Sequence, residues 1–143
     1  MNKKSFTLME IIIVIVLISV VAAFGIPSYR RAILRSRERQ AIVNLELIHA
    51  AASFYGTQAG GFLPGNNRDI DFINQNFGLR VAATNGTVYE YDSADPASFD
   101  IKVEITNLGG GSFFDIQMDE GPISSTNPCC EAGTGACLSL PSC

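Results

Sequence analysis

The chain has 143 residues and a formal net charge of −4, so it is long enough for one small compact domain. Residues 45–143 hold twelve acidic residues against three basic ones, Arg68, Arg80 and Lys102, and this acidic balance argues against nucleic-acid binding by that part of the chain. The single histidine, His49, lies in a predicted helix, and the sequence contains no phosphate-binding loop, nucleophile elbow or metal-ligand spacing. The composition therefore predicts a protein that is not an enzyme and has no cofactor or metal.

The first predicted element is an apolar helix. Residues 11–24 carry no charge and include eleven large apolar side chains, which together favour membrane insertion by roughly 3 to 7 kcal/mol. Glu10 lies at the start of this segment and opposes insertion by at most about 2.5 to 3.5 kcal/mol. Residues 6–29 comprise 24 positions, and about 20 suffice to cross the hydrocarbon core. We therefore expect residues 6–29 to span a membrane.

The residues before this segment form a signal. A short basic leader, residues 1–5 (MNKKS), is followed directly by residues 6–10 (FTLME), and this pattern resembles the prepilin-type signal of the type IV pilin family. The resemblance implies cleavage between Ser5 and Phe6 by a prepilin peptidase, N-methylation of Phe6, and pairing of Glu10 with the terminal amine of a neighbouring subunit. The family normally has Gly before the cleavage point, whereas this chain has Ser5, the next small residue, which predicts less efficient cleavage at the same position.

Two observations favour other interpretations. Residues 22–25 (AAFG) supply small side chains behind the apolar run, as an ordinary cleaved secretory signal does. Two lysines precede the run and five arginines follow it between residues 30 and 39, so the positive-inside rule would place the head in the cytoplasm. The prepilin-type motif and the cysteines favour the opposite orientation. The arginines are then expected either to lie near anionic lipid headgroups or to contact acidic heads of neighbouring copies.

A longer helix is predicted beyond the apolar run. Gly25 and Pro27 predict a kink or an unwound turn, because proline lacks the N–H that the preceding turn requires. In the family, such residues mark local unwinding during assembly, so both are expected to take part in assembly. Residues 28–55 have apolar side chains at helical spacing, and Gly56, followed by Gly60-Gly61, is expected to end the helix. Two stripes are predicted to be buried: Leu34, Ala41, Leu45, Ile48, Ala52 and Tyr55 form one, and Val43, Leu47, Ala50 and Phe54 widen it.

The rest of the chain is predicted to form a short helix and a small antiparallel sheet. Residues 57–68 read as a loop and residues 69–77 as a helix capped by Asp69. Strands are predicted at residues 80–84 and 87–92 around an Asn85-Gly86 hairpin turn, and at residues 99–105 and 114–118, giving three or four strands. The fold class is therefore α+β, a type IV pilin fold. Its parts are a leader (1–5), a membrane or filament-core helix (6–29) and a head (30–143) with helix 30–55 and sheet 80–118.

The four cysteines lie in the last fifteen residues, which indicates an oxidising compartment and a disulfide-bonded tail. Zinc is the competing interpretation, but adjacent Cys129 and Cys130 lack the spacing of zinc knuckles. A bridge between these two neighbours would strain the peptide that joins them. Two bridges among Cys129, Cys130, Cys137 and Cys143 are expected, with Cys129 bonded to either Cys137 or Cys143.

The resemblance implies a structural subunit of an extracellular pilus. The precursor would lie in the bacterial inner membrane and then polymerise with identical copies, with the help of an assembly platform and its ATPase. The filament would serve attachment, motility or DNA uptake. A pseudopilin of type II secretion is the alternative within the family, although the cysteine-rich and glycine-rich tail differs from the acidic calcium loop of one pseudopilin class. A monomeric membrane-anchored binding ectodomain is the alternative outside the family.

Overall fold

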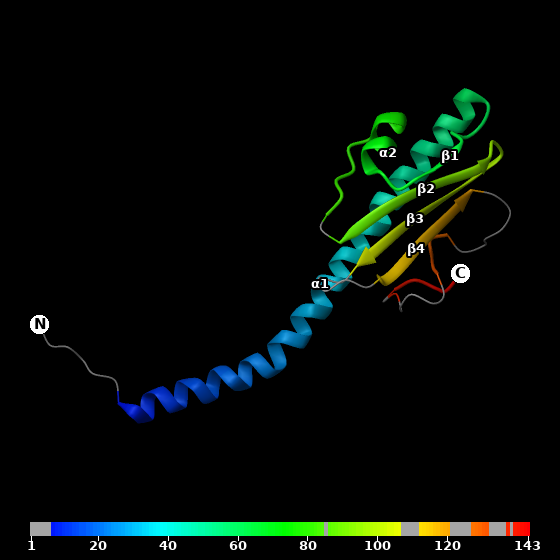
Figure 1. Cartoon of the computed structure of the whole chain (residues 1–143). Helices are drawn as coiled ribbons and strands as arrows, with labels where there is room; N and C mark the ends of the chain where they lie inside the picture. Colours follow the sequence, from blue (N-terminus) through cyan, green and yellow to red (C-terminus); the bar gives the residue numbers. More distant parts are fainter. Residues whose placement is uncertain (1–6, 85, 107–111, 121–126, 132–136, 138) are drawn as a thin grey trace, which may run out of the picture. The chain divides into compact units, whose positions relative to one another are not determined.

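The computed structural model describes residues 7–84, 86–106, 112–120, 127–131, 137 and 139–143. The chain divides into two compact units, Met1–Ser36 and Arg37–Cys143. One helix, α1 (Leu8–Ala59, 52 residues), contributes its N-terminal part to the first unit and its C-terminal part to the second (Figure 1). The α+β fold predicted from the sequence is confirmed, with a long N-terminal helix, an antiparallel sheet and C-terminal disulfides.

Helix α1 is continuous through Gly25 and Pro27, so the predicted unwound turn is absent. Proline removes one hydrogen bond, the one that the carbonyl of Ala23 would accept. In the next position the Ser28 hydroxyl donates to the carbonyl of Phe24 at 3.1 Å, and side-chain hydrogen bonds of this kind help a helix to tolerate an internal proline. The helix on either side therefore keeps its regular ladder.

The C-terminal end of α1 lies at Ala59. Of the glycines predicted to stop the helix, Gly56 does not do so, whereas the prediction for Gly60-Gly61 is confirmed. Gly56 lies inside the helix. A Cβ at this position would overlap the ring of Phe62, so the glycine allows that ring to pack closely against the helix. The stop signal is Gly60, which adopts a left-handed φ of 78° that favours glycine. The amides of Gly60 and Gly61 both donate to the carbonyl of Gly56, at 3.0 and 3.1 Å.

The sheet has five antiparallel strands in the order β1-β2-β3-β4-β5, more than the three or four predicted. The strands are β1 (Gly65–Asn67), β2 (Thr87–Asp95), β3 (Ser98–Thr106), β4 (Ser112–Glu120) and β5 (Cys129–Cys130). Helix α2 (Ile70–Phe77) begins where predicted, because the Asp69 side chain accepts a hydrogen bond from the Asp71 amide at 2.9 Å. The loop predicted at residues 57–68 thus contains the end of α1 and the edge strand β1.

The predicted hairpin at Asn85-Gly86 is wrong. Residues 80–84 are not a strand, because the Asn74 side chain holds both backbone groups of Val81: it accepts from the Val81 amide and donates to the Val81 carbonyl, each at 2.8 Å. Strand β2 instead pairs with β1 on one side and β3 on the other. Asn85 itself lies outside the described residues.

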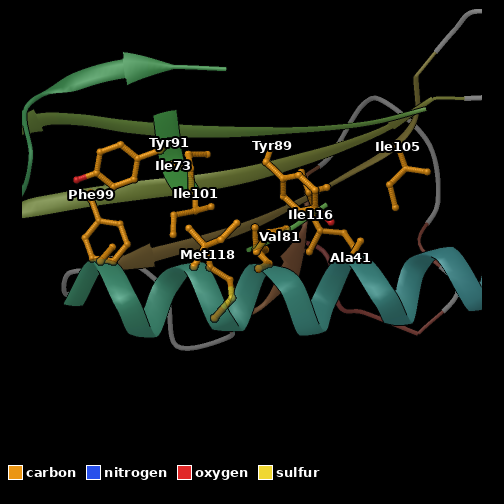
Figure 2. Packing of buried hydrophobic residues seen from close by; sticks show 14 of the residues in the cluster. Ala41, Ile73, Val81, Tyr89, Tyr91, Phe99, Ile101, Ile105, Ile116 and Met118 are labelled. Carbon is orange, nitrogen blue, oxygen red and sulfur yellow. The ribbon is translucent and has the colours of Figure 1, made fainter. Parts of the chain in front are cut away.

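The core of the second unit lies between α1 and one face of the sheet. The first predicted stripe is confirmed in part, since Ala41, Leu45, Ile48 and Ala52 are buried. They face alternate residues of β2, β3 and β4 (Figure 2). These are Tyr89, Tyr91, Phe99, Ile101, Val103, Ile105, Ile116 and Met118.

The second predicted stripe is wrong. Val43, Leu47 and Phe54 are 62, 48 and 64% exposed, because the sheet covers only one side of α1 and these three residues lie on the other side.

The tail is joined by two disulfides, Cys129–Cys143 and Cys130–Cys137. Of the two pairings left open for Cys129, the structure therefore contains the one with Cys143. A second attachment involves Glu38, which is only 1% exposed on α1. One of its carboxylate oxygens accepts hydrogen bonds from the backbone amide and the hydroxyl of Ser139, both at 3.0 Å. The tail is thus bonded both to itself and to the helix.

Candidate functional site

The N-terminal end of α1 is a capping box formed by Thr7 and Glu10. The Thr7 amide and hydroxyl both donate to Oε2 of Glu10 at 2.9 Å, and the Glu10 amide donates to the Thr7 hydroxyl at 3.3 Å. The reciprocal bonds satisfy amides that a helix N-terminus leaves without partners. The carboxylate also lies at the positive end of the helix dipole. Glu10 is therefore held in position by its own chain, and the spacing Thr-x-x-Glu was the sequence signal that could have revealed this.

The helix that follows exposes apolar side chains on all sides. Every large apolar residue from Leu8 to Phe24 is between 46 and 77% exposed. The Ser19 hydroxyl donates to the carbonyl of Ile15 at 2.8 Å, so the helix itself satisfies this polar group. The helix is long and apolar enough to cross a membrane. Such a surface requires a lipid or protein environment, because a helix that is apolar all round is a buried one.

The structure describes only some of the other residues predicted for this site. Ser5 and Phe6 lie outside the described residues, so cleavage and methylation there remain predictions. Gly25 and Pro27 lie inside α1, and their part in assembly remains a prediction. A Cβ on Gly25 would meet nothing within 4 Å. The packing of this chain therefore does not explain that glycine.

The arginines beyond the apolar segment are mostly exposed. Arg30, Arg31, Arg35 and Arg39 are exposed, and among the described residues none of them has an ion-pair partner. In contrast, two basic residues of the second unit are paired: Arg68, which follows β1, contacts Glu104 at 2.6 Å, and Lys102 of β3 contacts Glu131 at 3.0 Å. The helix therefore carries unpaired positive charge next to its apolar part.

The outer face of the sheet, which points away from α1, is acidic. Asp92, Asp100 and Asp119 lie in one row across β2, β3 and β4, because Asp100 is the register partner of both others. Burial, and then the neighbouring Asp119, raise the pKa of Asp100 to about 7. The Gln117 amide donates to Oδ1 of Asp119 at 2.8 Å. Within the described parts of the chain, no three His, Cys, Asp or Glu side chains converge as a metal site.

Comparisons with known proteins bear on this N-terminal site. Residues 1–26 match the family model of the prokaryotic N-terminal methylation motif. Over 103 residues the chain is 29% identical to the type IV major pilin protein PilA of Myxococcus xanthus (strain DK1622). The match covers 66% of this chain but only 44% of that relative. No solved structure matches the chain significantly. The chain is therefore similar to type IV pilins, both in the methylation motif at its N-terminus and over the 103 residues aligned with a major pilin.

Proposed function

We propose that the chain is a structural subunit of an extracellular type IV pilus, which polymerises with identical copies through the N-terminal half of α1. The observation that carries the proposal is the apolar helix, exposed on all sides, directly behind the methylation motif. An enzymatic role has no support from this arrangement, because the N-terminal site offers one carboxylate and an apolar surface.

The proposal explains how one helix serves in two environments. In the precursor the apolar residues lie in the inner membrane, where their insertion outweighs the unfavourable contribution of Glu10. A prepilin peptidase then removes residues 1–5, and Phe6 is methylated. When the assembly platform and its ATPase extract the subunit, helices of other copies replace the lipid around residues 11–24. The filament is then displayed outside the cell.

Glu10 aligns each copy with its neighbour in this scheme. Its carboxylate is already bonded to the amide and hydroxyl of Thr7, so it enters the apolar filament core with part of its hydrogen bonding satisfied. The terminal amine of a neighbouring Phe6 supplies the opposite charge, and this lowers the penalty of a buried carboxylate. A copy displaced along the axis leaves that charge unpaired.

The test uses cells that express the full chain with Glu10→Gln, which keeps the shape and removes the charge. Filaments sheared from the cell surface are counted by electron microscopy, and the subunit is identified in them by mass spectrometry. We expect a loss of at least tenfold in filaments with Glu10→Gln and no loss with the control Glu46→Gln, an exposed glutamate on the same helix. Filaments at the wild-type level with Glu10→Gln would contradict the role of the carboxylate. Wild-type cells without filaments containing this chain would contradict the function.

A further inference from the structure

Three arginines follow the apolar segment within the first compact unit. Arg30, Arg31 and Arg35, here called the proximal arginines, are the first charged residues beyond residues 11–24, and all three are exposed. They belong to the same unit as that segment. Measured along α1, the end of the segment lies about 9 Å from Arg30 and about 17 Å from Arg35. The surroundings of the apolar segment therefore end close to these side chains.

The chain itself does not neutralise the proximal arginines. Within the described parts of the chain, none of them has an ion-pair partner. Residues 11–37 contain no acidic side chain, so the only acidic neighbour at helical pairing distance is Glu38, three positions after Arg35. Its carboxylate is buried and accepts two hydrogen bonds from Ser139. A negatively charged partner would therefore have to come from another molecule.

We propose that the proximal arginines bind the phosphates of anionic phospholipids, on the head side of the membrane that holds residues 11–24. The inference rests on the membrane-embedded precursor proposed above and adds a lipid partner to it. A guanidinium group suits this partner, because its planar fork can donate two hydrogen bonds to one phosphate. The surface is also continuous with the segment that is long and apolar enough to cross a membrane.

The thickness of a bilayer places its headgroups at these arginines. The hydrocarbon core is about 30 Å thick and takes up about 20 helical residues. A core that begins at Ile11 therefore ends near Arg30. The headgroup layer adds about 5 to 7 Å on that side, and Arg35 lies about 8 Å beyond Arg30 along the helix. Arginine side chains are long enough to reach back toward this layer, so all three can contact phosphates.

The acidic head of a second copy is a less suitable partner in the membrane. Residues 45–143 hold three basic and twelve acidic residues, which gives that part a formal net charge of −9. An anionic membrane surface repels a body of its own sign. The headgroups, in contrast, already lie at the depth of the proximal arginines. The charge balance of the chain thus favours lipid over a neighbouring head.

The contact also explains positive charge on the exported side of the membrane. The proposed function places the head outside the cytoplasm, where the positive-inside rule does not expect a cluster of arginines. An anionic surface strengthens the binding of each nearby arginine about fivefold. Bound headgroups therefore compensate the proximal arginines and fix the depth at which α1 leaves the bilayer.

Fluorescence quenching tests the contact in the full chain. The sequence contains no tryptophan, so Tyr29→Trp, at an exposed position next to Arg30, introduces a single reporter. This protein is reconstituted into vesicles of phosphatidylcholine and phosphatidylglycerol in which one or the other lipid is brominated. We expect the quenching to show a preference of about fivefold or more for phosphatidylglycerol, which is the attraction of at least one arginine. Added salt should weaken the preference, because it screens exposed charges.

Variants of the reporter protein identify the groups responsible. Replacing all three proximal arginines by glutamine should abolish the preference, whereas replacing all three by lysine keeps the charge and should retain it. Arg80→Gln removes an exposed arginine of the second unit and is the control, which should leave the preference unchanged. Formation of both disulfides, mapped on non-reduced protein, shows that each variant is folded. No preference in the reporter protein, or an equal preference in the glutamine variant, would overturn the proposal.

The remaining outcomes separate this inference from the proposed function. A preference that disappears as the protein-to-lipid ratio rises would assign the arginines to the acidic head of another copy and would overturn the lipid partner. Carbonate extraction of cell membranes shows whether the wild-type chain is embedded in the bilayer. An embedded chain without a preference for phosphatidylglycerol would overturn the inference alone. Release of the chain by carbonate would overturn the membrane-embedded precursor as well.

Discussion

The paired carboxylates of Asp100 and Asp119 predict that the head becomes less stable as the pH rises. The two residues are register partners on β3 and β4. Oδ1 of Asp100 is buried and has no hydrogen-bond partner among the described residues. Burial and Asp119 raise the pKa of Asp100 to about 7 from an ordinary value of 3.8, while Lys102 and Gln117 lower it. Asp92 on β2 adds a third carboxylate to the row.

The raised pKa of Asp100 determines whether the head gains or loses stability as the pH rises. The folded state binds the proton more tightly than the unfolded state, so the stabilisation is complete below about pH 4 and is lost as the pH rises through about 7. Three pKa units would correspond to about 4 kcal/mol. The pair is partly open to solvent, and screening reduces the expected change to about 1 to 2 kcal/mol.

The assay compares Asp100→Asn with the wild type in the detergent-solubilised full chain. Asparagine keeps the size of the side chain and can donate a hydrogen bond to Asp119 at every pH. Hydrogen exchange of the β3 and β4 amides should show equal stability at pH 4 and a variant that is more stable by about 1 to 2 kcal/mol at pH 8. Asp95→Asn, at the exposed last position of β2, is the control and should keep the pH dependence of the wild type. Equal pH dependence in Asp100→Asn and the wild type, or a less stable variant at pH 8, would refute the reasoning.

Three further predictions concern the tail, the helix end and the leader. Glu38→Ala removes the acceptor of two hydrogen bonds from Ser139 and should destabilise the head by about 2 to 3 kcal/mol. Proteolysis of the tail should then be faster than in the wild type, and an unchanged rate would contradict the prediction. Gly56→Ala normally stabilises a helix, but overlap with Phe62 should make it destabilising by about 1 to 3 kcal/mol in thermal unfolding, and a stabilised variant would disprove the packing argument. Ser5→Gly should speed leader removal in a pulse-chase experiment, and an unchanged rate would show that Ser5 does not limit cleavage.

Local patterns predicted the parts of this protein that depend on neighbouring residues. An uncharged run of sufficient length indicates an apolar helix wherever the chain places it. An aspartate before an apolar turn indicates a helix start, and Asp69 caps α2 as predicted. Apolar and charged residues alternate in residues 99–105, and this alternation correctly predicted which side chains of β3 are buried and which face outward. The closely spaced cysteines likewise indicated the two bridges of the tail.

Two of the errors have a common physical origin in side-chain contacts that reach beyond the immediate neighbours of a residue. Asn85-Gly86 has strong local turn propensity, but Asn74 takes the backbone groups of Val81 that a hairpin strand would use. Gly56 has the local signature of a helix end, yet the Phe62 ring makes it a packing residue. In both cases a side-chain contact across six or seven positions overrides a local preference of about 1 kcal/mol.

For the candidate site, the sequence by itself determined the chemical character: an apolar helix with one carboxylate near its start, within a match to the N-terminal methylation motif. Only the tertiary structure decided which side of α1 the sheet covers, and hence that Val43, Leu47 and Phe54 remain exposed. Periodicity places these residues on one stripe but cannot identify the surface that meets it, because both sides of the helix are apolar. That choice depends on the placement of strands that follow α1 in the chain, and no local pattern within the helix contains this information.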